Sequence, residues 1–368
     1  MSGKRKGPPP EDVTRRAEEG RTAEGRDVTP AVGRRGQAGG WVRTGEKVAL
    51  AKERWGDARW SFLYDKDTRY ASASANGSVA EAARRARGGG EVPVAVQGPM
   101  IHATLWTWEV PVYFFVGGLA AGSSLVSVAC DQFGDHEGAE LARKLALGAV
   151  LPAPLLLIAD LGRPARFLNM LRIFKVRSPM SMGAWCLVAF STTATGAVAA
   201  DVLGFKRAGR AAGVATALLG SYLGSYTGAL LAATATPLWA RSRVLLAPIF
   251  VCTAAASGAG ANRLLQRSGP TREALGHLEL LAMGGKLILS PINDRHIGSL
   301  AEPLEHHRAY KLSNWAARIG VALRLLRRGG DVPSVLFLAS ALLTRIAWIE
   351  AGKQSAGDDE AVARMARR

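Results

Sequence analysis

The sequence has few of the residues that hold metal-based redox groups in membrane proteins. Its 368 residues include three cysteines, Cys130, Cys186 and Cys252, which are far apart and lack CxxC spacing. This distribution argues against an iron–sulfur cluster or a zinc site. A haem anchor needs pairs of histidines facing each other within the bilayer. The six histidines nearly all fall at the ends of apolar segments or in loops: His102, His136, His277, His296, His306 and His307. We therefore expect no haem and no metal in this protein, so any electron carrier would be a small organic molecule such as a quinone.

A recognisable export signal is also lacking. Arg15–Arg16 and Arg34–Arg35 resemble twin-arginine pairs, but no apolar stretch follows either pair. We therefore expect no cleavable signal peptide.

Residues 1–100 are polar, with 19 Lys or Arg against 13 Asp or Glu, which gives about +6 of the formal charge of +17. Together with the Gly and Pro content, this composition predicts a mostly disordered basic arm. Its aromatic and Arg residues suit docking onto a protein partner, and the alternative is contact with anionic lipid. No motif supports nucleic-acid binding.

Beyond Leu105 the sequence changes to long apolar runs separated by short basic loops. A bilayer-spanning helix needs roughly 20 apolar residues. Three runs reach that length, between Glu109 and Asp131, Arg177 and Asp201, and Arg210 and Arg241, and runs at 243–263 and 144–160 come close to it. Weaker candidates lie at 272–293, 312–326 and 332–349. The pattern predicts an all-α integral membrane protein with five good spans and up to eight, made of a membrane domain at 101–356 and a short polar tail at 357–368.

Loop charge gives an expected orientation. With eight spans, the positive-inside rule favours a cytoplasmic amino terminus in the cell's inner membrane. The first outer loop is then expected at 131–144, where the net charge is acidic.

Two groups of polar residues lie where they can meet a ligand inside the bilayer. Glu109 and Tyr113 are four residues apart and so share one face of a helix. A carboxylate and a phenol in this arrangement can hydrogen-bond a quinone carbonyl and pass a proton. The alternative is an acid at the water boundary and a tyrosine of the interfacial belt. Tyr222 and Tyr226 are expected on the side of their helix opposite a seam of small residues at Gly220, Gly224 and Gly228.

A charged stretch follows the second apolar run, within "DLGRPARFLNMLRIFKVRSPMSMGAW". We interpret it as a loop, in which Asp160 and Arg163 form a structural ion pair or take part in proton movement. Arg166 and Arg172 are assigned, with Lys175 and Arg177, to lipid headgroups or partner docking.

Later charges have two interpretations each. Glu279 and Lys286, seven residues apart, can pair with one another or belong to a proton path. Arg345 and Glu350 are expected to snorkel or pair near the interface.

Four stretches make the sequence resemble the NrfD/PsrC membrane subunits of polysulfide, nitrite and related redox complexes. They are "WTWEVPVYFFVGGLAAG", the charged stretch quoted above, "SYTGALLAATATPLW" and "RIAWIEAGKQSA". The resemblance implies eight helices in two four-helix bundles, with a quinone pocket in the first bundle near an iron–sulfur partner subunit. In the polysulfide reductase member, a first-helix histidine and a fourth-helix tyrosine contact the quinone. Tyr113 takes the histidine position here and Tyr226 the tyrosine position. A phenol donates a hydrogen bond but accepts protons poorly near neutral pH, so Glu109 is expected to supply that capacity.

The function implied is a membrane anchor that reacts with menaquinone or ubiquinone and is not catalytic alone. It would exchange electrons with a four-cluster ferredoxin-like subunit serving a molybdopterin enzyme, such as a formate dehydrogenase. Two alternatives are a proton-translocating or transport module without redox chemistry, and a purely structural anchor.

Overall fold

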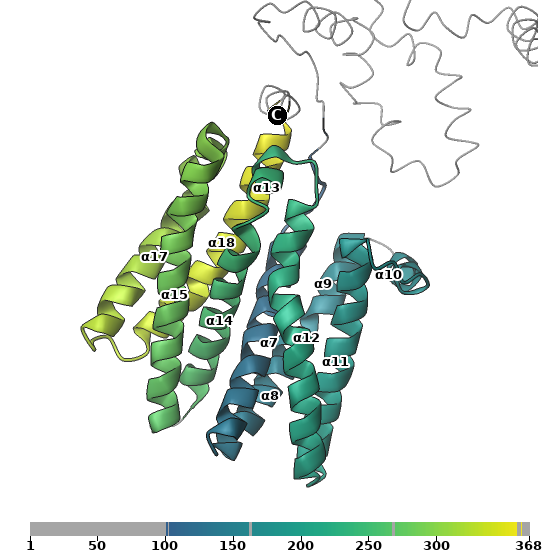
Figure 1. The fold of residues 1–368 in the computed structure, drawn as a ribbon, viewed down its shortest axis with the longest axis vertical. Helices are drawn as coiled ribbons and strands as arrows, with labels where there is room; N and C mark the ends of the chain where they lie inside the picture. The colour runs from purple at the N-terminus through teal and green to yellow at the C-terminus, as the bar shows by residue number, and fades with distance from the viewer. Residues whose placement is uncertain (1–100, 102, 162–163, 267–268, 359–361, 363–368) are drawn as a thin grey trace, which may run out of the picture. The chain divides into compact units, whose positions relative to one another are not determined.

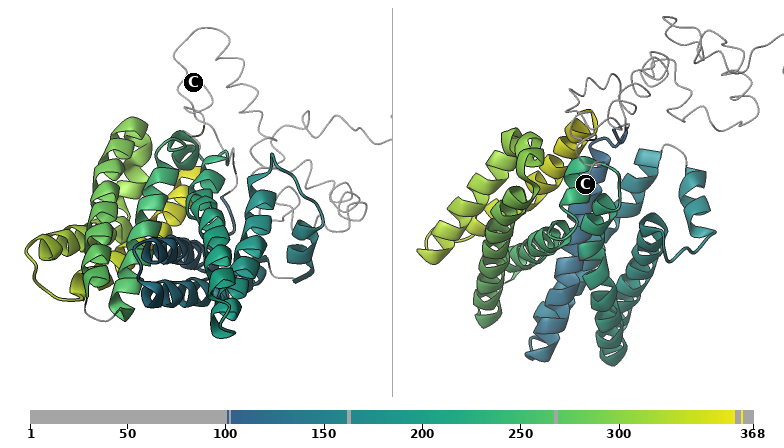
Figure 2. Two further views of the ribbon diagram at one scale, coloured as in Figure 1. Left: turned by 60° about the horizontal axis from the view of Figure 1, so that its bottom comes forward. Right: turned by 45° about the horizontal axis from the view of Figure 1, so that its top comes forward.

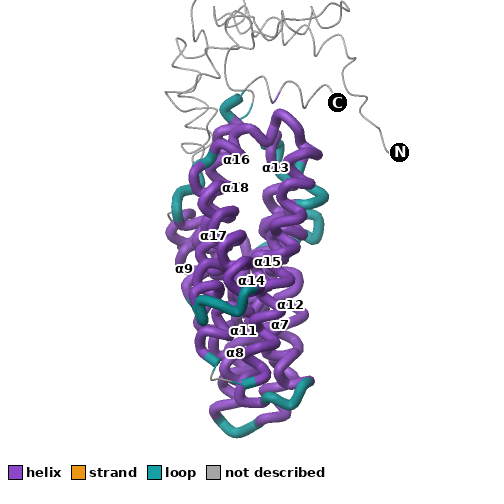
Figure 3. The backbone as a smooth tube through the Cα atoms, turned by 90° about the vertical axis from the view of Figure 1, so that its left-hand side faces the viewer, coloured by secondary structure: helices purple, strands orange, loops and turns teal. Residues whose placement is uncertain are grey.

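The computed structural model describes residues 101, 103–161, 164–266, 269–358 and 362. The predicted arm over residues 1–100, Arg163 and most of the predicted tail lie outside these residues. Within the described part the protein forms helices joined by mostly short loops, and no strand occurs there (Figure 3).

The helices follow one another in sequence as an up-and-down series (Figure 1). Their bounds are α7 Glu109–Gln132, α8 His136–Val150, α9 Pro152–Leu161, α10 Pro164–Leu171, α11 Pro179–Val202, α12 Lys206–Ala232, α13 Pro237–Arg241, α14 Leu246–Leu265, α15 Pro270–Ile297, α16 Glu302–His306, α17 Arg308–Leu325 and α18 Val332–Ala356. A 3₁₀ turn, Gly298–Ala301, joins α15 to α16.

Five helices are long and apolar enough to cross a membrane. They are α7, the continuous α8–α9 rod over His136–Leu161, α11, α12 and α18. Four of these were predicted as good spans. The helix over 243–263, α14, is not among the five, because Pro248, Asn262 and Arg263 within its 20 residues lower its mean hydropathy. Conversely α18, predicted as a weaker candidate, qualifies because the long apolar run around Arg345 keeps the mean hydropathy of the helix high.

The predicted outer loop at 131–144 is much shorter in the structure, because α8 already begins at His136. The Asp135 side chain accepts a hydrogen bond from the Gly138 N–H at 2.8 Å and so caps the helix. Gly134, at φ +82°, ends α7 with the left-handed turn that glycine favours, and Gly204 at φ +82° ends α11 in the same way. Most of this polar run is therefore helix rather than loop.

Helices α7 and α14 pack closely against each other near the middle of the described fold (Figure 1). Gly122 of α7 faces Ala254 and Gly258 of α14 so closely that a Cβ on either glycine would overlap the opposite backbone. Asn262 then donates a hydrogen bond to the Ser123 hydroxyl at 3.1 Å across the same contact. Small residues thus let α7 and α14 pack at close range.

The two-sided character predicted for α12 is confirmed. A Cβ on Gly220 would meet Phe190 and Ala121, and a Cβ on Gly228 would meet the backbone at Ala247 of α14. The tyrosines lie elsewhere on the helix: the ring of Tyr226 lies against Gly183 of α11, and Tyr222 is 39% exposed.

The predicted loop between the second and third spans contains a short helix, α10, which lies outside the long helices and beside α9 (Figure 2). The loop that follows it exposes Ile173, Phe174 and Val176. Exposed apolar residues among cations are typical of a segment lying in the interfacial layer of a membrane.

Candidate functional site

Two buried tyrosines from different helices lie close together near the end of the fold where α7 begins. Tyr113 of α7 is 5% exposed and Tyr226 of α12 is 4% exposed. Tyr226 lies close enough to interact electrostatically with Tyr113, Tyr222 and Cys186. The ring of Tyr222 stacks on that of Tyr226, with the centroids 5.9 Å apart. Among the described residues, no hydrogen bond to the Tyr113 or Tyr226 hydroxyl is formed, so both phenols can serve a ligand.

Gly183 of α11 makes room for Tyr226. A Cβ built on Gly183 would overlap the Tyr226 ring and its hydroxyl oxygen. Cys186, one turn further along α11, donates its thiol to the Leu219 carbonyl at 3.5 Å. The site therefore draws on α7, α11 and α12, and the contribution of α11 was not predicted, since one glycine in an apolar run carries no distinctive signal.

Two carboxylates lie at the same end as the tyrosines. Glu109 begins α7, one turn before Tyr113, and accepts a hydrogen bond from the Thr107 hydroxyl. Asp160, in the last turn of α9, accepts from the Thr107 N–H and lies within electrostatic range of Glu109 and Lys353. The sequence singles out Glu109 and Asp160 separately, and the fold brings them together.

The cations of the charged stretch do not join this group. Arg166 is exposed and donates to the Leu161 carbonyl at 2.8 Å, so it caps the end of α9. Arg172 is exposed, in the loop after α10. The predicted Asp160–Arg163 pair stays a prediction, because Arg163 is outside the described residues.

A buried arginine that the sequence did not single out ties three helices together at the opposite end of α7. Arg143 of α8 is 4% exposed. It donates to Asp131 of α7 at 2.6 Å and to Asp201 of α11 at 2.6 Å. Each aspartate lies three residues before the glycine that ends its helix, where a negative charge opposes the helix dipole. Arg143 pairs with both carboxylates and offsets part of their combined charge.

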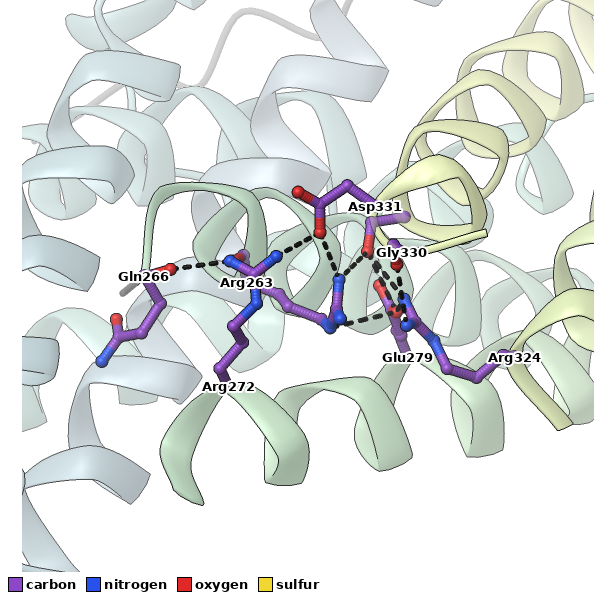
Figure 4. Close-up of polar contacts among 8 residues, drawn as sticks. Arg263, Gln266, Arg272, Glu279, Arg324, Gly330 and Asp331 are labelled. Atoms are coloured by element: carbon purple, nitrogen blue, oxygen red, sulfur yellow. Dashed lines mark hydrogen bonds and ion pairs between the residues drawn. The ribbon is translucent and has the colours of Figure 1, made fainter. Parts of the chain in front are cut away.

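A second charged group joins the ends of α14, α15, α17 and α18, and we call it the Arg263 cluster: Arg263, Arg272, Glu279, Arg324 and Asp331 (Figure 4). Glu279 is fully buried, pairs with Arg324 and accepts a hydrogen bond from the Ser334 hydroxyl at 3.0 Å. Arg272 also donates to the Gln266 carbonyl at 2.7 Å. These ion pairs and hydrogen bonds hold the helix ends together.

Asp331 lies in the loop before α18 and pairs with Arg263 at 2.9 Å and with Arg272. Partial burial opposes ionisation of its carboxyl, but the hydrogen bonds from Arg272 and Arg263 outweigh that effect and hold its pKa below the usual range.

Three predictions about the later charges can be settled. Glu279 and Lys286 do not pair with each other: the Lys286 ammonium donates to Ser313 at 3.1 Å and to Asn314 at 2.6 Å. The prediction that Arg345 snorkels or pairs near the interface is wrong, because it is 2% exposed and its guanidinium lies 3.6 Å over the Phe250 ring. The small side chains of α7 and α14 leave room for it there. Glu350 does form a pair, with Lys353 at 2.9 Å.

The group of Tyr113, Tyr222 and Tyr226 has the chemistry of a binding site for a small ring with polar substituents. Two tyrosines from α7 and α12 lie in one apolar cluster, and a carboxylate lies one helical turn away. Such a site can bind and orient a carbonyl oxygen and can hold a proton beside it. Among the described residues, no group of three or more His, Cys, Asp or Glu side chains has the arrangement of a metal site.

Two comparisons with known proteins match this sequence. The family described as "Polysulphide reductase, NrfD" matches residues 99–290, which is more than half of the sequence. A curated relative, a polysulfide reductase subunit of Wolinella succinogenes, is 30% identical over 96 residues. That match covers 24% of this protein and 30% of the relative's length. With its apolar helices and this family match, the protein belongs to the NrfD family of multi-pass membrane proteins.

Proposed function

We propose that this protein is the quinone-reactive membrane subunit of a multi-subunit redox complex. In this proposal its eight long helical rods all cross the membrane, in two four-helix bundles formed by α7–α12 and α14–α18. It lies in the inner membrane with its amino terminus in the cytoplasm. It passes electrons between the menaquinone or ubiquinone pool and a ferredoxin-like iron–sulfur subunit that serves a molybdopterin enzyme.

One observation carries the proposal: two buried tyrosines, Tyr113 and Tyr226, lie close together, and their hydroxyls form no hydrogen bond among the described residues. A hydroxyl without a protein partner is free to donate to a ligand, and such a hydrogen bond contributes about 0.5–1.5 kcal/mol. A ligand with carbonyl oxygens can accept these bonds, and a quinone has two. The residues present therefore fit a quinone, and a bound quinone supplies the electron transfer itself.

The protein's own residues bind the ring, orient it and handle the proton. Tyr113 and Tyr226 donate hydrogen bonds to it, and Gly183 lets Tyr226 reach it. Phenols are poor proton acceptors near neutral pH. Glu109, one turn nearer the membrane surface, takes or gives the proton, and Asp160 lies within range to pass it on toward water.

The competing transport function needs a continuous polar path through α15, α17 and α18. Their buried polar residues instead form two groups, the Arg263 cluster around Glu279 and the Lys286–Ser313–Asn314 group. The buried Met283 lies between them on α15, and its sulfur accepts from the Ser340 hydroxyl at 3.8 Å. The described residues thus favour the redox function over transport.

The test is quinol-dependent turnover of the purified complex carrying Tyr113→Phe, Tyr226→Phe or Glu109→Gln. We expect each phenol change to raise KM for quinol about tenfold, the loss of one hydrogen bond in a dry site. Glu109→Gln should lower kcat with little effect on KM. Tyr310→Phe is the matched control, because its hydroxyl donates to Asp294 at 2.7 Å in the other group of helices. Normal kinetics in all three site variants would place the quinone site elsewhere.

A further inference from the structure

A buried cation between α15 and α17 has no acidic partner in contact with it. Lys286 is fully buried, and its ammonium donates only to two neutral oxygens, those of Ser313 and Asn314. No carboxylate lies within 4 Å of it among the described residues. Arg318 repels its charge and Asp294 attracts it. Isolated buried ammonium groups are costly, so an anion nearby would stabilise this arrangement.

A cavity of about 170 Å³ opens beside Lys286 and gives room for such an anion. It is lined by residues of α16 and α17: Glu305, Tyr310, Lys311, Asn314, Trp315 and Arg318. Asn314 connects the two features, since it lines the cavity and accepts the Lys286 hydrogen bond. The volume equals that of roughly five or six water molecules, which suits one phosphate group and is too small for a whole drug-sized ligand.

The charges around the cavity are mostly positive. Two cations, Lys311 and Arg318, and one carboxylate, Glu305, line it, and Lys286 lies behind Asn314. A second carboxylate nearby, that of Asp294, accepts a hydrogen bond from the Tyr310 hydroxyl. Neither Lys311 nor Arg318 forms an ion pair within the described residues. Arg318 lies 6.0 Å over the Trp315 ring, a cation–π contact that orients its guanidinium.

The outer face of α17 matches a lipid better than an aqueous surface. Leu312, Trp315 and Ile319 are 58%, 60% and 47% exposed there. Lys311 and Arg318 line one cavity although they are about 10 Å apart along the helix. Apolar residues, a tryptophan and long cations mixed on one face are typical of the layer where lipid headgroups lie.

We propose that this pocket binds the phosphodiester of an anionic phospholipid. Lys311 and Arg318 contact the phosphate, Lys286 adds positive charge behind Asn314, and the acyl tails run over Leu312, Trp315 and Ile319. The proposal rests on the insertion of α17 in the membrane, as proposed above, and is independent of the quinone site.

The test is thermal unfolding of the delipidated full-length protein in neutral detergent, with lipid added back. Phosphatidylglycerol should raise Tm, whereas phosphatidylcholine and inorganic phosphate should not. Lys311→Gln and Arg318→Gln should each weaken apparent lipid affinity about tenfold, the effect of one charge-assisted hydrogen bond. Arg308→Gln, an exposed cation of the same helix outside the cavity lining, is the matched control and should respond like the unsubstituted protein.

Other outcomes would overturn the proposal. A Tm increase with inorganic phosphate alone would indicate a site for free anions. Equal increases with both lipids, or an undiminished response in a variant carrying both Lys311→Gln and Arg318→Gln, would show that the pocket does not bind anionic lipid. Loss of a co-purifying protein from Lys311→Gln and Arg318→Gln, with lipid affinity unchanged, would identify a docking face for an acidic partner. Quinol turnover should stay normal in these variants, so this result and the test of the quinone site are read separately.

Discussion

At the residue scale, the site depends on a few positions whose roles differ in how well sequence predicts them. Tyr113, Tyr222 and Tyr226 stand out because a polar ring in an apolar run needs a partner for its hydroxyl. Gly183 does not stand out, since its role comes from a contact with Tyr226 of α12 that is distant in the sequence. Arg143 was missed because its two aspartates, Asp131 and Asp201, are brought to it only by folding.

Gly183→Ala tests the fit of the tyrosine site. The added methyl group would overlap the Tyr226 ring and displace its hydroxyl, so we expect quinol affinity to fall at least about tenfold. Gly196→Ala on the same helix is the control, because a Cβ there meets nothing within 4 Å. That change should leave kinetics intact and add up to about 1 kcal/mol of stability. Equal quinol affinity in the two variants would contradict the assigned role of Gly183.

Two buried arginines should respond in opposite ways to the same substitution. Arg143→Met leaves Asp131 and Asp201 without their shared cation, which we expect to cost about 3–5 kcal/mol of unfolding free energy. Arg345 has an aromatic ring and the Phe250 carbonyl as partners, so Arg345→Met strands no opposite charge. It should be neutral or stabilising by about 1–4 kcal/mol. Chemical unfolding in mixed micelles measures both, and a larger loss in Arg345→Met would show that an unseen anion pairs with it.

At the element scale, helix positions follow from apolar runs and turn residues, and helix ends do not. The predicted span at 144–160 is too short because His136, Glu137 and Glu140 make the start of α8 resemble a loop. The capping by Asp135 and the pairing of Arg143 explain why that polar stretch is helical. The charged stretch after α9 is predicted as a loop, and it contains α10 because the apolar residues there fall on one side of a short helix.

The Arg263 cluster holds four helix ends together, and its contribution should depend on pH. The pKa of Asp331 is lowered in the folded protein. Its stabilising effect is therefore full above the unfolded value of about 3.9 and is lost as pH falls through the lower folded value. Asp331→Asn should lower Tm at pH 6, through a loss of no more than about 1 kcal/mol of unfolding free energy for so exposed a pair, and the difference should vanish in strong acid. A Tm difference for Asp331→Asn that persists unchanged in acid would refute this assignment.

At the scale of the whole molecule, the family and the membrane location were predictable, because the quoted stretches run through most of the apolar region. How the helices group was implied by the resemblance alone. The structure adds a physical reason for their contact, since Gly122 and Gly258 let α7 and α14 approach to backbone distance. What no sequence pattern predicted is the cavity beside Lys286, which depends on side chains from separate helices.

The most direct test of the quinone site is reduction of co-purified iron–sulfur clusters by a quinol analogue, followed by the loss of visible absorbance. The full-length protein would be purified with its partners in mild detergent, unsubstituted and as Tyr226→Phe, Glu109→Gln and the control Tyr310→Phe. The account predicts rapid bleaching in the unsubstituted and control complexes, and slow bleaching in the two site variants. Clusters that co-purify and yet bleach equally fast in all four complexes would contradict it.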